Sequence, residues 1–452
     1  SESGWENSGR WWYRQIRGIQ MANTLVDMFR MKDIKKKILI TFGLLIVTRI
    51  GAYLPIPGVN PGVVYDYYRM YSSSITEYLN FFSGGAFSNF SIFMLGVMPY
   101  ISTEIIFQLL MLVIPSLKKL AEDPQGSKKI QQYTRYATVL VCIIQSLAAS
   151  VYAQSIPGAL SVPVGVFIPV AILSCTTGSM LCVWLGEKIT QFGVGNGISL
   201  LIFAGIVARI PNAFYTMVTG IASKTINPVS LVVVIIMFFF VVALVVYEEQ
   251  GTRKIPVTYA KRVVGRKMYG SQSTYIPFKI NPSGVIPVIF ASTLLQIPLM
   301  LGNTNVGWMV AVANFLNPQR APYLIIYTLL IIGFAFFYTQ ISLNPIEMAK
   351  NIRDNGGSVP GVRNEKLEEY LTKVLNRIVL PGAIFLAFIA LIPTLVQLIF
   401  DLPASVAMLF GGTSLIILVG VDLDTMRQLD GMMKMHHHDG FVDSKKRKTK
   451  KI

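Results

Sequence analysis

About ten stretches of this chain are long and apolar enough to cross a membrane as helices, because a spanning helix needs about twenty mostly apolar residues. The chain has 452 residues, of which 53% are hydrophobic and only 14% are charged, and its mean hydropathy is +0.54. A soluble domain cannot hide that much apolar surface, so we expect an all-α polytopic membrane protein. The candidate spans are 34–54, 92–114, 137–153, 163–186, 197–211, 229–247, 284–302, 323–343, 379–400 and 404–421.

Several of these spans are short or interrupted. The fifth offers only the thirteen residues Ile198–Ile210 before Pro211, and the second and seventh contain Pro99 and Pro287. Helices of this kind are tolerated where protein or water, and not lipid, surrounds them. The pattern therefore predicts a protein-lined interior.

The basic residues gather in alternate loops. Cytoplasmic loops of membrane proteins carry an excess of Lys and Arg, and this excess sets the orientation. The alternation supports ten spans with both termini in the cytoplasm. Of the 40 basic residues, 35 lie in the segment up to Lys37, in the loops 115–136, 187–196, 248–283 and 344–378, and in the tail from Asp424.

Two of the basic loops are too long to be simple connectors. In the loop 248–283, the β-prone runs Ile255–Ala260 and Tyr275–Ile280 flank the basic stretch Lys261–Lys267, which predicts a protruding hairpin. The loop 344–378 has turn signals and then a charged helical stretch, Glu365–Lys373. Two basic protrusions suggest that a macromolecule docks there, although charge that only sets the topology is the alternative.

Residue types that serve catalysis are scarce. The only histidines, His436–His438, are adjacent in the tail, so the membrane holds no imidazole for a Ser-His or metal-based protease. Cys142, Cys175 and Cys182 lie in apolar stretches without paired or metal-ligand spacing, and we interpret them as small buried apolar residues. Aspartyl chemistry is remote, because Asp422 and Asp424 follow the last span.

Ionisable groups within the spans are also few: Arg49, Glu104, and Glu187 with Lys188 at a helix end. Ion-coupled transporters place such groups at the midplane, so a secondary small-molecule transporter is the weaker alternative, and it would depend on Glu104. The run Gly193-x-Gly195-x-Gly197 lacks a following Lys-Ser/Thr, and we interpret it as a flexible helix connection.

A set of short motifs, ordered along the chain from about Arg30 to Gln428, closely resembles those of the SecY family, the pore subunits of bacterial protein translocases. Each motif alone is weak, but together they are specific. The motifs are Phe82-Ser83-Gly84-Gly85-Ala86, Met98-Pro99-Tyr100-Ile101-Ser102, Gln132-Tyr133-Thr134-Arg135-Tyr136, Gly186-Glu187-Lys188-Ile189-Thr190, Gly195-Asn196-Gly197-Ile198-Ser199, Tyr259-Ala260-Lys261-Arg262, Gln272-Ser273-Thr274, Pro360-Gly361-Val362-Arg363 and Gly411-Gly412-Thr413-Ser414-Leu415.

The resemblance implies a clamshell of two inverted halves around an hourglass pore, with residues 34–211 in one half and 229–421 in the other. Residues 1–33 would be a cytoplasmic N-terminal segment and 424–452 a basic cytoplasmic tail. Family members close the pore with a ring of aliphatic side chains, which dewets and blocks ions but deforms around a chain. The matching ring positions are Val97, Ile101, Ile198, Ile202, Ile289 and Ile417.

The resemblance also implies a short plug helix at about 80–93. This segment includes Ser83, Gly84, Gly85 and Phe87, and its weak helix propensity suits a segment that must leave the pore. A lateral gate would lie between helices 2–3 and 7–8 and would let a signal sequence pass into lipid. The candidate gate residues are Ser102, Gln108, Gln145, Ser292, Thr293 and Ile297.

Partners follow from the same resemblance. Lys261, Arg262, Arg266 and Arg363 match positions that dock the SecA motor or the ribosome. The expected partners are SecE, a SecG-like subunit, SecA, the ribosome, signal sequences with nascent chains, and lipid of the bacterial cytoplasmic membrane. The implied function is a protein-conducting channel that uses no cofactor and carries no catalytic residue.

Overall fold

The computed structural model describes residues 31–449, apart from 72–75, 77–79, 224–227, 260–261, 265–266, 270–272, 302–306, 318–319 and 401–411. Within the described residues, ten helices correspond to the ten predicted spans, so the prediction of a helical, polytopic fold is confirmed. They are α3 (Lys32–Gly51), α6 (Met98–Val113), α8 (Pro124–Gln154), α9 (Val164–Phe192), α10 (Gly197–Ala222), α11 (Pro228–Gln250), α12 (Ile286–Leu301), α14 (Ala321–Ser342), α16 (Leu367–Phe400) and α18 (Gly412–Thr449).

Six of the described helices are individually long and apolar enough to cross a membrane. A seventh span results if α6 and the short helix α7 (Pro115–Glu122) are counted together, although the chain bends by 105° between them. The other three spans are weaker by composition or length: α3 carries Lys35–Lys37 and Arg49, α12 has only 16 residues, and α18 is charged in its second half. Neighbouring helices, and not hydropathy alone, must stabilise these three.

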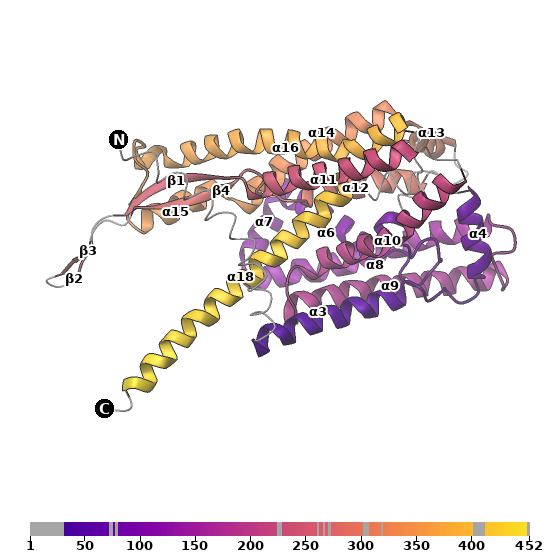
Figure 1. Ribbon diagram of the computed structural model, residues 1–452, viewed down its shortest axis with the longest axis horizontal. Helices are drawn as coiled ribbons and strands as arrows, with labels where there is room; N and C mark the ends of the chain where they lie inside the picture. The colour runs from indigo at the N-terminus through magenta and orange to yellow at the C-terminus, as the bar shows by residue number, and fades with distance from the viewer. Residues whose placement is uncertain are drawn as a thin grey trace.

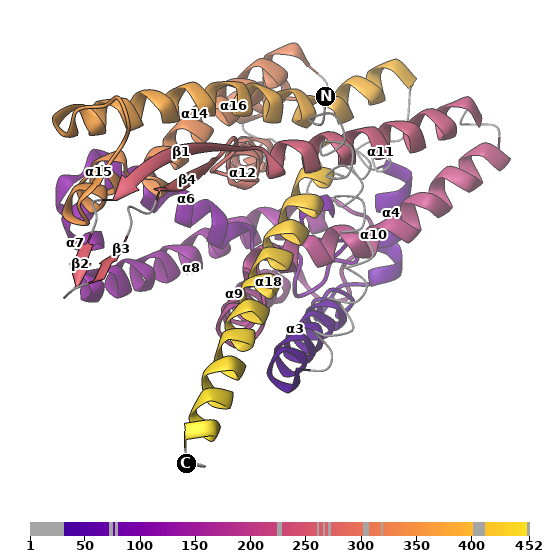
Figure 2. The same cartoon turned by 60° about the vertical axis from the view of Figure 1, so that its left-hand side comes forward.

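The spans lie in two groups. Figures 1 and 2 show α3, α8 and α9 together on one side, and α11, α14 and α16 together on the other. Between them, α10 packs on α9 and α18, and α12 packs on α6 and α14. Because the first group has five spans, an odd number, the second group begins on the opposite side of the membrane from the first. This is the condition for an inverted arrangement.

The basic loops share one end of the molecule. The left end of Figure 1 holds α7, the β-sheet and α15 (Pro345–Asp354), while α4 (Pro61–Tyr71) and α13 (Gly307–Phe315) lie at the opposite end. Successive connections between the spans thus lie at alternate ends of the molecule, and the basic connections share one end. The positive-inside rule predicts that the end with the sheet faces the cytoplasm.

Helix boundaries differ from the sequence prediction at three places. α6 begins at Met98 and not at 92, because Gly96 takes a positive φ of 55° and residues 92–97 form turns. α10 does not end at Pro211 but runs to Ala222, since one proline removes a single backbone donor and leaves the other bonds intact. α11 continues to Gln250, so the loop predicted from 248 begins at Gly251.

The predicted hairpin in the loop 248–283 is present, and its location on the cytoplasmic side stays a prediction. Strand β1 (Thr252–Tyr259) pairs antiparallel with β4 (Ser273–Lys279), from Thr252↔Lys279 to Thr258↔Ser273. The short β5 (Gly357–Ser358) adds to the other edge of β1, and β2 (Arg262–Val264) pairs with β3 (Lys267–Tyr269) at the tip.

The two basic protrusions form one folded unit. Ile255 and Val257 of β1 and Phe278 of β4 are buried in a cluster with Ala349 of α15 and Leu371 of α16. The predicted helical stretch Glu365–Lys373 is present as the 3₁₀ turn η1 (Asn364–Lys366) and the first turns of α16, which continue without a break into the span. A force on this unit is therefore transmitted directly into the helix bundle.

Large apolar side chains cover the outside of the bundle. Phe42 on α3, Leu173 on α9 and Phe239 on α11 are each more than 60% exposed. Such surfaces are rare on soluble proteins and are typical of lipid-facing helices. Cys142, Cys175 and Cys182 are buried and free, as the sequence predicts.

Candidate pore, plug and lateral gate

The six predicted ring positions come together in space. Val97, Ile101, Ile202, Ile289 and Ile417 are each at most 6% exposed and belong to one hydrophobic cluster, and the partly buried Ile198 packs against it. These side chains come from α6 and α10 of the first helix group and from α12 and α18 of the second. The cluster contains residues of both helix groups, and the role of these six side chains as a ring stays a prediction.

The plug segment is a chain of tight turns. Residues 80–82 are helical and 83–90 are turns, so the described part of the segment is less regular than the helix that we expected. Gly84 and Gly85 have φ of 64° and 91°, which favours glycine over residues with a side chain. Asn80 supports the turns: its carbonyl accepts from Gly85 N at 2.9 Å and its Oδ1 accepts from Ser88 N at 3.0 Å.

The plug residues divide between two hydrophobic clusters. Ser83 Oγ accepts a hydrogen bond from Phe87 N at 3.0 Å and donates one to Asn80 O at 3.2 Å. Phe82 and Ala86 belong to the same hydrophobic cluster as the ring residues, whereas Phe87 packs in a second cluster with α4, α8 and α9. The segment therefore lies between the constriction and the outer helices of the first group.

The proposed gate seam runs along α12, which packs against α6 and α8. Ser102 and Ser292 are buried, and their hydroxyls donate to backbone carbonyls of their own helices, at 2.9 Å and 2.8 Å. Gln108 Oε1 on α6 and Thr293 Oγ1 on α12 are buried and have no hydrogen-bond partner among the described residues. An unpaired buried polar atom costs about 1–3 kcal/mol, and these two atoms belong to α6 and α12, which pack on each other.

The remaining two gate candidates are less informative. Gln145 on α8 is half-buried. Ile297 lies on α12 just before Pro298, but its side chain is outside the described part of the structure.

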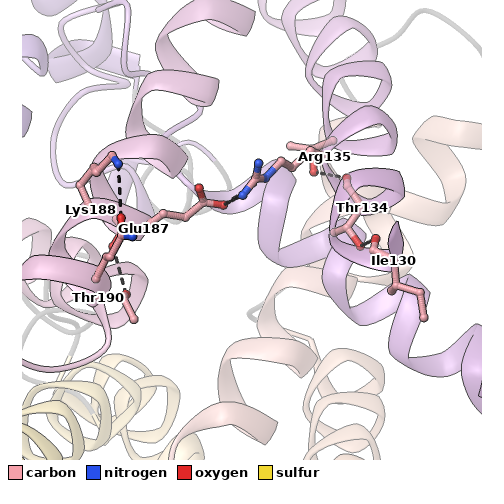
Figure 3. Close-up of polar contacts among 9 residues, drawn as sticks. Ile130, Thr134, Arg135, Glu187, Lys188 and Thr190 are labelled. Atoms are coloured by element: carbon pink, nitrogen blue, oxygen red, sulfur yellow. Dashed lines mark hydrogen bonds and ion pairs between the residues drawn. The ribbon is translucent and has the colours of Figure 1, made fainter. Parts of the chain in front are cut away.

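Two sequence motifs meet at the cytoplasmic end of the first group. Figure 3 shows Arg135 on α8 extending toward Glu187 on α9, with Nη2 and Oε1 2.8 Å apart. Both side chains are more than a third exposed, so this ion pair contributes at most about 1 kcal/mol. It is a surface contact that adds little to the stability of the fold.

The connection between α9 and α10 is pinned, and our interpretation of it as flexible is wrong. Val194 N donates to Thr41 Oγ1 on α3 at 3.0 Å, and Gly195 N donates to Gln428 Oε1 on α18 at 3.0 Å. Asn196 caps α10, since its Oδ1 accepts from the backbone nitrogen of Ile198 at 3.1 Å. Each glycine turn is thus held by a side chain from another element.

The docking candidates are only partly described. Lys261 and Arg266 lie outside the described residues, and Arg262 is on β2, where its side chain is not described. Arg363 is exposed in the turn between β5 and η1, and its carbonyl accepts from Lys366 N at 2.9 Å. Its side chain is free to meet a partner at the surface of the cytoplasmic unit.

Two features of the site were not found by sequence reasoning. Gly205 on α10 lies against Gly84: a Cβ on Gly84 would lie 2.7 Å from the Gly205 Cα. An isolated glycine within a helical pattern was the available signal for such a close approach. The contact of Gln428 with Gly195 joins residues 233 positions apart and left no pattern in the sequence.

Comparisons with known proteins agree with this geometry. A family model described as SecY matches residues 91–426. A protein translocase subunit SecY from Borreliella burgdorferi is 44% identical over 420 residues, covering 92% of this chain and 96% of the relative. The SecY subunit of Escherichia coli is 40% identical over 420 residues, covering 91% and 94%.

Solved structures are similar in fold. A structure described as that of a protein conducting channel aligns with a TM-score of 0.62 at 19% identity, covering 87% of this chain and 91% of that one. Sec61, in the canine ribosome-channel complex from the endoplasmic reticulum, aligns with a TM-score of 0.58 at 18% identity and the same coverage.

Proposed function

The chain belongs to the SecY family of protein translocase subunits, and from this premise we propose that it forms a gated channel for unfolded secretory proteins. The observation that carries this proposal is the aliphatic cluster at the meeting of the two helix groups. Residues of α6, α10, α12 and α18 contribute to it, and the plug segment packs below it. A constriction of methyl groups holds no fixed polar partner, so it seals against ions and yields to a passing chain.

A second property of such a channel is sideways release of apolar segments into lipid. The seam of α12 with α6 and α8 is the natural exit, because it joins the two groups away from the chain connection between α10 and α11. The unpartnered Gln108 Oε1 and Thr293 Oγ1 make this seam marginal. When the seam opens, its helices lose packing contacts. An apolar signal sequence that enters the opening would restore part of these contacts.

We propose SecE and a SecG-like subunit as membrane partners, in the bacterial cytoplasmic membrane with both termini on its inner side. An apolar cavity of about 180 Å³ opens between α10, α11 and α18, and it has room for one large apolar side chain of a partner helix. Its lining consists of Ile206, Ile210, Phe214, Ile235, Phe238, Phe239, Leu415 and Leu418.

The cytoplasmic unit is the proposed docking site for SecA and the ribosome. It is basic, it projects from the bundle, and it is continuous with α16. A ribosome carries a dense phosphate charge that basic side chains neutralise. One similar structure, Sec61, was solved in a ribosome-channel complex, which supports the ribosome as a partner here.

The small-molecule transporter alternative has no support. Glu104 is present on α6, but the relatives named above are translocase subunits along nearly their whole length. We therefore assign the chain the role of a channel subunit and not that of a catalyst.

Purification of the tagged chain from its native membrane tests the function. We expect a small SecE-like subunit to copurify, and the reconstituted complex to move a signal-bearing precursor into vesicles when SecA and ATP are supplied. The same precursor without its signal sequence is the control. A complex that moves neither protein, or both equally, would contradict the proposal.

A further inference from the structure

Three polar or backbone contacts tie the plug segment to the first helix group. Arg49 on α3 donates from Nη1 to the Gly84 carbonyl at 3.1 Å. Gly205 on α10 lies against Gly84, and the backbone nitrogen of Ile56, between α3 and α4, donates to the carbonyl of Phe90 at 3.0 Å. The ring, by contrast, takes side chains from both groups. Parting the groups would therefore open the ring without removing any of these three plug contacts.

Arg49 is the one charged side chain in this set. It lines a cavity of about 40 Å³ together with Phe82, Ser83 and Val97, directly beside the constriction. That volume holds a water molecule or two. Its Nε is buried and has no hydrogen-bond partner among the described residues. A guanidinium placed here is thus incompletely satisfied, and the Gly84 carbonyl is the partner that the structure gives it.

We propose that Arg49 is a latch that holds the plug in the closed pore, so that plug departure is a separate step from the parting of the two helix groups. The inference rests on the proposed channel function. A hydrogen bond with a charged donor is stronger than one between neutral groups, and it is stronger still where water is scarce. The latch is released when another acceptor replaces the Gly84 carbonyl. A translocating polypeptide supplies such acceptors, because every residue it brings into the pore carries a carbonyl oxygen.

The contact also explains why Gly84 is a glycine. A Cβ at this position would lie 2.8 Å from Arg49 Nη2 and 2.7 Å from the Gly205 Cα, and φ is 64°. Any larger side chain would have to displace the guanidinium or the plug backbone. Gly84→Ala therefore tests the same contact from its other side.

The test uses the complex with its partner subunits in planar bilayers, with resting potassium chloride conductance as the measurement. Arg49→Met keeps the length of the side chain and removes its donors. We expect the resting open fraction to rise about tenfold or more, which corresponds to the loss of one hydrogen bond to a charged group. Arg49→Lys keeps one charged donor and should leak less than Arg49→Met. Arg69→Met, which changes an exposed arginine of α4, is the matched control and should not leak.

Two further readouts separate a latch from general loosening of the fold. If Arg49 acts through Gly84, the double variant Arg49→Met/Gly84→Ala should leak no more than the leakier single variant. In a background with Cys142, Cys175 and Cys182 replaced by alanine, Ser83→Cys should be alkylated faster from the outside when Arg49 is methionine.

Leakage that adds up in the double variant, or unchanged alkylation of Ser83→Cys, would overturn the latch. A wild-type complex that does not translocate protein would instead refute the channel function itself. A wild type that translocates, together with an Arg49→Met variant that stays tight, would refute the latch alone.

Discussion

Aliphatic side chains at the proposed ring would block ions at rest and still yield to a translocating chain, which polar side chains could not do. Val97, Ile101 and Ile417 offer no hydrogen bond to an ion, so a narrow opening between them loses its water. The same groups have no fixed partners to lose when a chain pushes them apart. Methyl bulk at these positions is therefore the quantity on which the seal depends.

Replacing Ile101, Ile202 and Ile289 together with glycine removes that bulk. We expect the resting channel to conduct ions and to accept precursors with defective signal sequences, as measured by bilayer conductance and by export. A triple glycine variant of the lipid-facing residues Leu140, Leu173 and Ile236 controls for the helix-weakening effect of glycine. Equal resting conductance in the ring variant and in the wild type, at normal expression, would contradict the assigned ring.

Arg363 is a second residue whose predicted role can be tested by substitution. It is exposed on the cytoplasmic unit, so reversing its charge should leave the fold intact. We expect Arg363→Glu to stop most SecA-dependent export while the protein stays inserted and stable. Lys366→Glu, at an exposed position in the neighbouring turn, is the matched control. Normal export by Arg363→Glu would remove this residue from the docking surface.

At the scale of single residues, the sequence predicted some features of the site and missed others. The motif match proposed six ring positions, and the structure places all six in or against one hydrophobic cluster, although their role as a ring stays a prediction. The motif match did not reveal the contact of Gly84 with Gly205 or that of Arg49 with the plug, since each joins segments that are distant in sequence. Only the packing of one helix on another decides which residues meet in this way.

Among the elements, α18 contacts both helix groups, which its composition does not indicate. It begins as a span beside α11 and α16, and then leaves the bundle as a continuous helix (Figures 1 and 2). On the way it contacts both groups: Gln428 accepts from Gly195 of the first, and Arg427 donates to the Glu249 carbonyl of the second at 2.7 Å. The sequence predicted a span followed by a basic tail, because charge ends a hydropathy signal without ending a helix.

The pinned connection between α9 and α10 predicts a measurable loss of stability. Thr41→Val leaves the buried Val194 N–H without its acceptor, which costs about 1–3 kcal/mol. We expect a lower thermal midpoint for the purified complex, measured by loss of native fluorescence in detergent. Thr216→Val is the control, because that threonine is exposed on α10 and bonds only within its helix. Equal losses in both variants would show that the connection is not held by Thr41.

At the scale of the whole molecule, two groups of helices meet along two seams. The chain connects the groups beside α10 and α11, whereas α12 packs on α6 and α8 at the other seam. We expect the α12 seam to be the weaker, because Gln108 Oε1 on α6 and Thr293 Oγ1 on α12 have no hydrogen-bond partner among the described residues. The architecture was predictable from the alternation of apolar spans and basic loops. The unpartnered atoms were not, because only the folded state decides which polar atoms find partners.

The most direct test of this account is a reversible disulfide across that weak seam. Cysteines at Ser102 on α6 and Ile297 on α12 should bridge in the closed channel, which requires Cα atoms within about 7 Å. We expect oxidation to stop translocation, because a signal sequence can no longer part the helices, and we expect reduction or a longer flexible crosslinker to restore it. Each single cysteine variant, oxidised in parallel, is the control. Full translocation through a completely oxidised channel would show that the seam need not open, and it would contradict the lateral gate.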